Sequence, residues 1–389
     1  MPQNVVLYAS VGEVLTRYEV DVAAATLTER ESVSLPENVQ YAWPHANRHF
    51  LYVATSDSAT GMGAQGTSHH LTGFAIDPAS GRLSEQGPRV VLPHRPIHMA
   101  TDIPSRHALV AFSNPGGLRI YRIENDGSLG TEVPQPSGID VGIYPHQVRA
   151  TLDNKHVILV SRGHDPSAGK PEDPGALEVF AYQDGVVGRE TAVAPNKGYG
   201  FGPRHLDFHP TRPWIYVALE RQNALAHFAM RDGTVGPEPL STVPTLADPD
   251  KPRPRQLVGT VHVHPSGRFV YVANRASGVV EDSGQKVFNG GENNLAVYRI
   301  DESTGAPSLI QHVDTRGIHC RTFHIDPSGR ILVAAHIMGL PVRHGNTIEQ
   351  IPARLSVFRI AADGTLGFVR SYDVELGGKS LWWMGMVTL

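Results

Sequence analysis

The chain has 389 residues, with 34 Lys and Arg against 38 Asp and Glu, and a formal net charge of −4. This near balance gives no electrostatic case for a nucleic-acid or membrane-surface binder, and no apolar run approaches the roughly 20 residues that span a bilayer. Cys320 is the single cysteine, so no intrachain disulfide can form. The first residues lack the basic and apolar regions of a signal peptide, which predicts a cytoplasmic protein.

One strand pattern recurs along the chain, as in VVLYAS, IYVALE and VYVANR. A turn such as HPSGR often precedes it, and a second apolar stretch with an Asp-Gly or Ser-Gly turn follows it. These pairs between alternating apolar residues are typical of β-hairpins. The seven copies lie at residues 5–10, 50–56, 108–113, 157–162, 215–220, 270–275 and 331–336.

Seven sheet units that recur at similar intervals along the chain predict an all-β, seven-bladed β-propeller. We expect residues 1–389 to form a single propeller domain. The first copy lacks an upstream strand, while the tail at 380–389 is a strand without a unit. Pairing of these N- and C-terminal strands would close the ring without an exposed edge. Surface insertions near one mouth of the channel are predicted at 57–70, 163–175, 242–256 and 277–293.

Charged residues gather at the end of the repeated strand. Superposing the last four copies on their final residue places Arg162, Glu220, Arg275 and His336 at one equivalent position. Because consecutive blades are neighbours in a propeller, these residues should form an arc around one end of the central channel.

A second position carries polar residues at the entry to the strand that is expected to line the channel. His146 precedes Arg162 by the same interval that separates Arg204 from Glu220. The equivalent residue of the next blade is Gly259. If both positions lie near the same mouth, these side chains converge on one polar pocket.

Such a pocket suits acid–base chemistry on an anionic substrate. A neutral imidazole can act as a general base near pH 7. Guanidinium groups can hold a carboxylate or phosphate and stabilise an oxyanion. A carboxylate among arginines stays ionised and can orient its neighbours. No serine or cysteine stands out as a nucleophile, and the His-containing segments HVHP and HCRTFH are weak metal signals. We therefore predict neither a catalytic metal nor a cofactor.

Three segments, GFGPRHLDFHP, IYVALERQN and VHVHPSGRFVYVANR, resemble the signature segments of the seven-bladed propeller lactonases. That family includes propeller-type 6-phosphogluconolactonases and 3-carboxy-cis,cis-muconate lactonizing enzymes. The resemblance covers nearly the whole chain as repeats and is most specific between residues 144 and 275. In the muconate lactonizing members, one His, two Arg and one Glu are the proposed active-site residues. They match His146, Arg204, Glu220 and Arg275 here.

The sequence thus predicts a lactonase for an anionic sugar-type or carboxylated lactone. His146 would activate water or shuttle the proton, and Glu220 would orient the site or act as the proton partner. Arg204 and Arg275 would hold the substrate anion and stabilise the oxyanion. A second group lines the channel and is expected to contact substrate: Arg162, His336 and His205.

Two alternatives stay open. The same residues could close a muconate-type diacid onto a lactone, as a cycloisomerase does. Alternatively, the propeller could be a binding scaffold without chemistry, because a fold does not determine function. The segment PHQV and the long insertion at 277–293 depart from the family pattern and leave the substrate open. The expected partner is a small anionic lactone or diacid, and the sequence does not indicate an oligomeric state.

Overall fold

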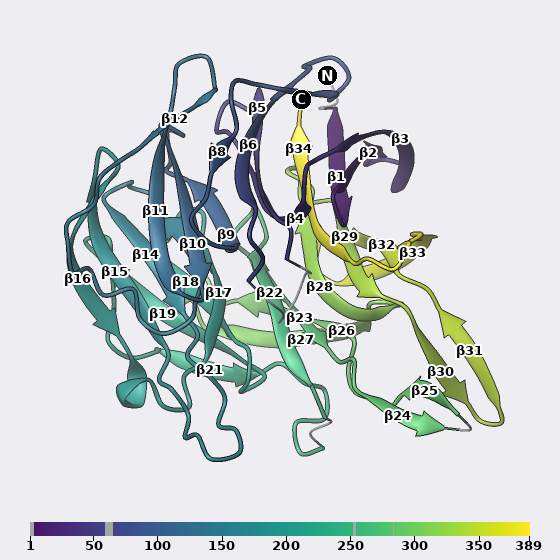
Figure 1. Cartoon of the computed structure of the whole chain (residues 1–389). Helices are drawn as coiled ribbons and strands as arrows, with labels where there is room; N and C mark the ends of the chain where they lie inside the picture. The colour runs from purple at the N-terminus through teal and green to yellow at the C-terminus, as the bar shows by residue number, and fades with distance from the viewer. Residues whose placement is uncertain (1–3, 59–64, 252–253, 283) are drawn as a thin grey trace.

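The computed structural model describes residues 4–58, 65–251, 254–282 and 284–389. Parts of three predicted insertions, at 59–64, 252–253 and 283, lie outside the described residues. Seven sheets of four or five antiparallel strands form the blades of a β-propeller (Figure 1). Within the described ranges the only helical segment is the short 3-10 turn η1 (Pro195–Gly198). No helix there is long and apolar enough to cross a membrane.

The first four blades follow the chain, except that the first borrows its innermost strand from the C-terminus. Blade 1 contains β3 (Thr26–Ser34), β2 (Val14–Asp21), β1 (Val5–Val11) and β34 (Leu381–Thr388). Blade 2 contains β4 (Asn38–Pro44), β5 (Phe50–Ser56), β6 (His69–Ile76), β7 (Leu83–Glu85) and β8 (Val90–Val91). Blade 3 contains β9 (Pro96–Thr101), β10 (His107–Ser113), β11 (Gly116–Ile123) and β12 (Leu129–Glu132). Blade 4 contains β13 (Pro145–Ala150), β14 (His156–Ser161), β15 (Ala176–Gln183) and β16 (Val186–Val193).

The last three blades carry additional short strands. Blade 5 contains β17 (Pro203–Phe208), β18 (Trp214–Leu219), β19 (Ala224–Arg231), β20 (Thr234–Val235) and β21 (Ser241–Pro244). Blade 6 contains β22 (Leu257–Val263), β23 (Phe269–Arg275), β26 (Asn294–Ile300) and β27 (Pro307–Asp314), with the separate hairpin β24 (Val279–Asp282) and β25 (Gln285–Phe288). Blade 7 contains β28 (Ile318–Ile325), β29 (Ile331–Met338), β32 (Arg354–Ile360) and β33 (Leu366–Asp373), with the hairpin β30 (Leu340–His344) and β31 (Thr347–Ile351).

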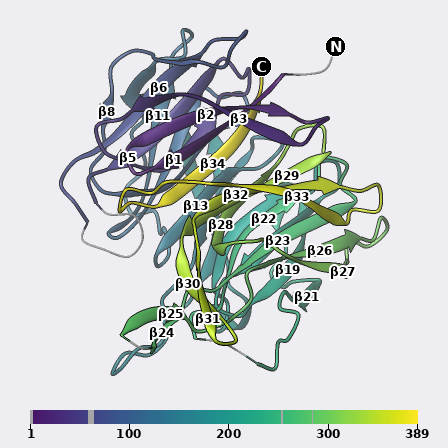
Figure 2. The ribbon, with the colours of Figure 1, turned by 90° about the vertical axis from the view of Figure 1, so that its right-hand side faces the viewer.

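The predicted closure of the ring is confirmed. β34 pairs antiparallel with β1, from Val5 opposite Thr388 to Val11 opposite Leu381. The yellow C-terminal strand lies beside the purple N-terminal strand in Figure 2. Blade 1 therefore contains the first and the last strand of the chain, and this pairing supplies hydrogen-bond partners for the backbone groups on the inner edge of β1.

In the described ranges the core consists of seven hydrophobic clusters, one between each pair of neighbouring blades. This explains why the repeated strand is apolar on both faces, since each face packs against a different blade. Tyrosines of this strand also tie neighbouring blades together. Tyr216 donates to the carbonyl of Gly305 at 2.8 Å, and Tyr271 donates to that of Gly364 at 2.9 Å. Both glycines have a positive φ, which suits the tight hairpin turn there.

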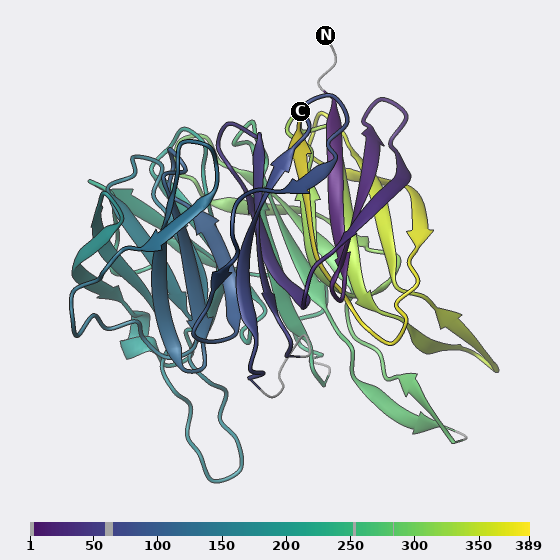
Figure 3. The same cartoon turned by 45° about the horizontal axis from the view of Figure 1, so that its top comes forward.

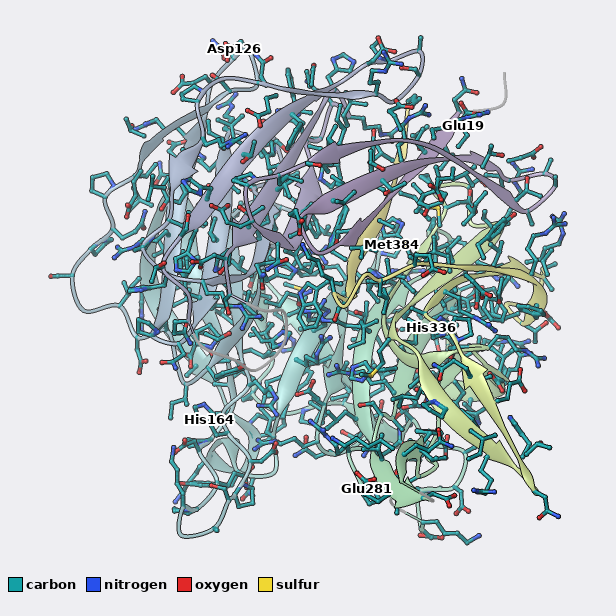
Figure 4. The ribbon with its side chains drawn as sticks, turned by 45° about the vertical axis from the view of Figure 1, so that its right-hand side comes forward. Glu19, Asp126, His164, Glu281, His336 and Met384 are labelled. Atoms are coloured by element: carbon teal, nitrogen blue, oxygen red, sulfur yellow. The ribbon has the colours of Figure 1, made fainter. Side chains whose placement is uncertain are left out.

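Several extensions project from the side of the ring opposite to the termini (Figures 1 and 3). They include the two hairpins β24–β25 and β30–β31, which contact each other, and the loop at 163–175. His164 marks this loop and Glu281 marks the hairpin β24–β25 in Figure 4. β14, β18 and β23 end on this side, so the strand-end residues lie at the mouth that carries the extensions.

Candidate active site

Glu220 lies at the centre of a buried cluster of arginines. It follows β18 directly and is 5% exposed. Its carboxylate pairs with Arg162 of blade 4, Arg204 of blade 5 and Arg275 of blade 6. The Arg204 Nε lies 3.0 Å from the Glu220 Oε1. The structure thus brings together four of the predicted site residues from three consecutive blades.

The charge of Glu220 is stabilised by these arginines. Burial alone would raise the pKa of the carboxyl, but Arg275, Arg162 and Arg204 outweigh it and lower the pKa to about 2. Glu220 is therefore ionised at neutral pH and neutralises one of the three positive charges around it. This is why an apolar strand ends on a carboxylate.

His146 borders this cluster as a neutral imidazole. It lies on β13 and is 8% exposed, and its Nδ1 is buried without a hydrogen-bond partner. Burial lowers its pKa well below the ordinary value, and Arg204, Arg321 and other arginines lower it further. A histidine in this state has a free lone pair at neutral pH, as a general base needs.

His205 packs against His146, with ring centroids 5.3 Å apart. Thr260 uses its hydroxyl proton in a bond to the Arg321 carbonyl at 3.1 Å, so it accepts from the His205 Nδ1 at 3.4 Å. The Nε2 of His205 is then the unprotonated nitrogen of a neutral ring. The structure therefore brings His205, too, next to the predicted base.

His336 does not join the cluster. It lies inside β29, is fully buried, and its Nδ1 donates to the carbonyl of Arg354 at 2.9 Å. Burial lowers its pKa to about 4. In the described part of the chain, no hydrogen bond or ion pair joins His336 to the Glu220 cluster. Figure 4 shows it within the sheet of blade 7.

The equivalence that led to His336 is displaced by one residue in blade 7. The backbone bond that opens each repeated strand runs from His209 to Trp214 in blade 5 and from Asp326 to Ile331 in blade 7. Counting from this bond, Glu220 corresponds to Ile337, so His336 corresponds to the buried Leu219. Alignment of the strands on their apolar residues does not reveal this shift. Because the repeated strand is apolar on both faces, apolar residues still match apolar residues when the register moves by one position.

The corrected register identifies Arg321, a residue that the sequence analysis missed. It precedes Ile337 by the same interval that separates Arg204 from Glu220. The innermost strands carry a register shift at these positions, which makes His146, Arg204 and Arg321 the extra residues of β-bulges. A bulge redirects the side chain of its extra residue. Here three blades use one to place a polar group in the channel.

His319 is a second residue that the sequence analysis missed. Its Nε2 lies 2.8 Å from the Nη1 of Arg275. Because a guanidinium only donates, this Nε2 accepts, and the Nδ1 then donates to the Ser277 hydroxyl at 3.0 Å. Arg275 is held from another side by the Val258 carbonyl, at 3.2 Å from its Nε. The residues at the equivalent position of the other repeats gave no indication of this contact.

The loop at 163–175 is tied to the rim of the cluster. Arg221, next to Glu220 in the chain, pairs with Asp165 at 3.1 Å and with Glu172 at 3.0 Å. Arg162 also pairs with Asp165, at 3.0 Å. This insertion therefore lies at the mouth where Glu220 is found.

The opposite end of the channel has a different character. A cavity of about 240 Å³ is lined there by aromatic and charged side chains, including Trp43, Arg149, Asp207, His262 and His324. Arg149 pairs with Asp207 at 3.4 Å and lies over the ring of Trp43. Among the described residues, no group of three His, Cys, Asp or Glu side chains has an arrangement suited to a metal ion.

The family model described as "Lactonase, 7-bladed beta-propeller" matches residues 6–338. The chain belongs to this family. The propeller lactonase shares 25% identity over 328 residues with a 6-phosphogluconolactonase of Bacillus subtilis, covering 82% of this chain and 83% of that protein. It shares 26% identity over 315 residues with a 6-phosphogluconolactonase of Pectobacterium carotovorum, covering 80% and 82%.

A solved structure of similar fold is the periplasmic gluconolactonase PpgL of Pseudomonas aeruginosa. It matches this propeller lactonase with a TM-score of 0.74 and 21% identity, over 99% of each chain. Family membership makes the chain an enzyme of the lactone hydrolase class.

Proposed function

We propose that this propeller lactonase hydrolyses an anionic sugar-type or carboxylated lactone, with His146, Arg204, Glu220 and Arg275 as its active-site residues. The observation that carries the proposal is the Glu220 cluster, in which a neutral imidazole borders buried guanidinium groups from neighbouring blades. The names of the relatives support a phosphorylated or aldonic lactone as substrate.

The proposed reaction uses these side chains and one water molecule. His146 accepts a proton from a water molecule as the water oxygen bonds to the lactone carbonyl carbon. Arg204 and Arg275 donate hydrogen bonds to the oxyanion that forms. The ring C–O bond then breaks, and the proton on His146 passes to the departing alkoxide oxygen. Glu220 positions the arginines without itself exchanging a proton, because its pKa is about 2. Metal-independent catalysis remains a prediction.

Hydrolysis is favoured over the two alternatives. The relatives reported above are named as lactonases rather than cycloisomerases, and a binding scaffold does not need a neutral base beside an arginine cluster. The cytoplasmic location expected from the sequence also stays a prediction, since one structural relative is named as periplasmic. Cell fractionation would test it.

The first experiment is a pH-indicator screen of the purified protein against phosphorylated, aldonic and carboxylated lactones, with an Arg275→Ala variant in parallel. We expect acid release by the wild type and a loss of at least ~10²-fold in kcat/KM in the variant, because an oxyanion donor is removed. An Arg268→Ala variant, at an exposed arginine of the same blade, is the matched control. Acid release from no lactone at all would reject hydrolysis, and carboxymuconates would be tried next.

The pH dependence of the free enzyme gives a separate test. The proposed base is active when His146 is neutral, and its pKa lies well below the ordinary value of 6.5. The acid limb of kcat/KM should therefore lie below pH 6.5, with a constant rate from there through pH 7.5. An acid limb at or above pH 6.5 would contradict His146 in this environment as the base.

A further inference from the structure

Arg321 is a buried arginine to which the proposed reaction assigns no role. It is 4% exposed and lies at the bulge of β28, the position that Arg204 occupies on β17. Its guanidinium lies 3.7 Å from the ring centroid of Trp382, and its Nη1 donates to the Trp382 carbonyl at 3.0 Å. These contacts hold the group in place but supply no negative charge.

The cluster contains more positive charge than its carboxylate can neutralise. Glu220 pairs with Arg162, Arg204 and Arg275, but not with Arg321. Across the described residues, no Asp or Glu oxygen forms an ion pair with Arg321. Burial lowers the pKa of Arg321, and the nearby charges of Arg204 and Arg275 lower it further. Buried charge without a partner is unfavourable, so this position calls for an anion.

The neighbouring polar groups are also donors that lack acceptors. The Nη1 of Arg204 is buried and makes no hydrogen bond. His98, on β9, accepts from the Val148 backbone N–H through its Nδ1 at 3.4 Å. Its Nε2 in a neutral ring is therefore protonated, yet this nitrogen is buried and has no partner. Unsatisfied donors on the inner strands of blades 3 and 5 match a ligand group that only accepts hydrogen bonds.

We infer that Arg321, together with Arg204, forms an anion subsite inside the channel that binds a carboxylate or phosphate group of the substrate. Arg204 then links this subsite to Glu220, because its Nε also pairs with the Glu220 carboxylate. The role of the subsite in catalysis rests on the proposed function, but its ability to bind an anion does not. Arg321 would thus determine specificity for lactones that carry an anionic substituent.

Binding of the isolated anion is tested first, without any assay of activity. Thermal unfolding of the full chain is followed with increasing inorganic phosphate or malonate, against NaCl at matched ionic strength. At 100 times Kd we expect Tm to rise by about 3 °C. The anion that gives the larger rise tells whether phosphate or carboxylate is preferred. Absence of a rise with both anions would overturn the subsite.

Variants assign the effect to Arg321. Arg321→Met should abolish the anion-dependent rise while keeping or raising Tm in anion-free buffer, because an unpaired buried charge is removed. Arg321→Lys keeps a positive charge and should retain part of the rise. This variant also keeps the inference testable if Arg321→Met folds poorly. Arg17→Met is the matched control, since Arg17 is similarly buried but pairs with Glu31 at 2.9 Å. It should lower Tm and leave the anion-dependent rise unchanged. A full rise in Arg321→Met would overturn the inference.

Kinetics separate this inference from the proposed function. For an anionic lactone, Arg321→Met should raise KM at least ~10-fold with a smaller effect on kcat, whereas an uncharged lactone should show an unchanged KM. Wild-type activity with no change in Arg321→Met would reject the subsite and retain the lactonase. Loss of the anion-dependent rise in a protein that hydrolyses no lactone would retain the subsite and reject the lactonase.

Discussion

Replacing Glu220 by Gln is expected to lower the free energy of unfolding by about 3–5 kcal/mol and to abolish most of the activity. The amide keeps the shape of the side chain but leaves Arg162, Arg204 and Arg275 buried without their shared counter-ion. Repulsion would then displace the guanidinium groups that are proposed to hold the substrate. Urea unfolding at pH 7, together with kcat/KM on the best lactone of the screen, measures both effects.

The destabilisation should depend on pH in a defined direction. The pKa of Glu220 is lowered from 4.5 to about 2 by folding, so its contribution is fully present above pH 4.5 and is lost as the pH falls toward 2. The difference between wild type and Glu220→Gln should therefore shrink over that interval. Glu302→Gln, at an exposed carboxylate in a turn, is the control and should change stability little. A difference that stays constant from pH 7 to pH 3 would show that the carboxylate charge is not what stabilises the cluster.

Replacing His146 by Ala is expected to lower kcat by ~10²–10⁴-fold, the usual contribution of a general base, with little change in KM. Because the ring is neutral in this environment, the substitution removes no charge and should change the stability little through electrostatics. Stopped-flow or pH-indicator assays of hydrolysis, with Tm as a check on folding, measure the effect. His49→Ala, at an exposed histidine, should behave like the wild type.

The outcome also separates two candidate bases. His205 lies next to His146 and is also a neutral ring, and its Nε2 is the unprotonated nitrogen. If His146→Ala retains wild-type kcat while His205→Ala loses it, the proton acceptor is His205 and our assignment is wrong. If both variants lose kcat but only His205→Ala also loses Tm, His205 supports the position of His146.

The fold could be predicted from the sequence because the chain contains internal repeats. Each copy of the apolar strand must be covered on both faces, and only a ring of neighbouring blades covers all of them. The unpaired tail at 380–389 likewise indicated how the ring closes, and β34 confirms it. Glu220 and Arg275 could be found in the same way, because a charge at the end of a buried repeat stands out against the pattern.

Only the tertiary structure determined which side chains meet. An alignment of the repeats on their apolar residues does not detect a shift of one residue, so it selected His336 and missed Arg321. The backbone hydrogen bonds that open the repeated strands give the correct register and identify Arg321. The contact between His319 and Arg275 joins two residues that are distant in the chain. The sequence by itself therefore determined the architecture, because it follows from repeated local patterns, and it predicted the type of chemistry from the charges at the ends of those repeats. The composition of the charge cluster depends on bulges and on contacts between blades, which are properties of the folded ring.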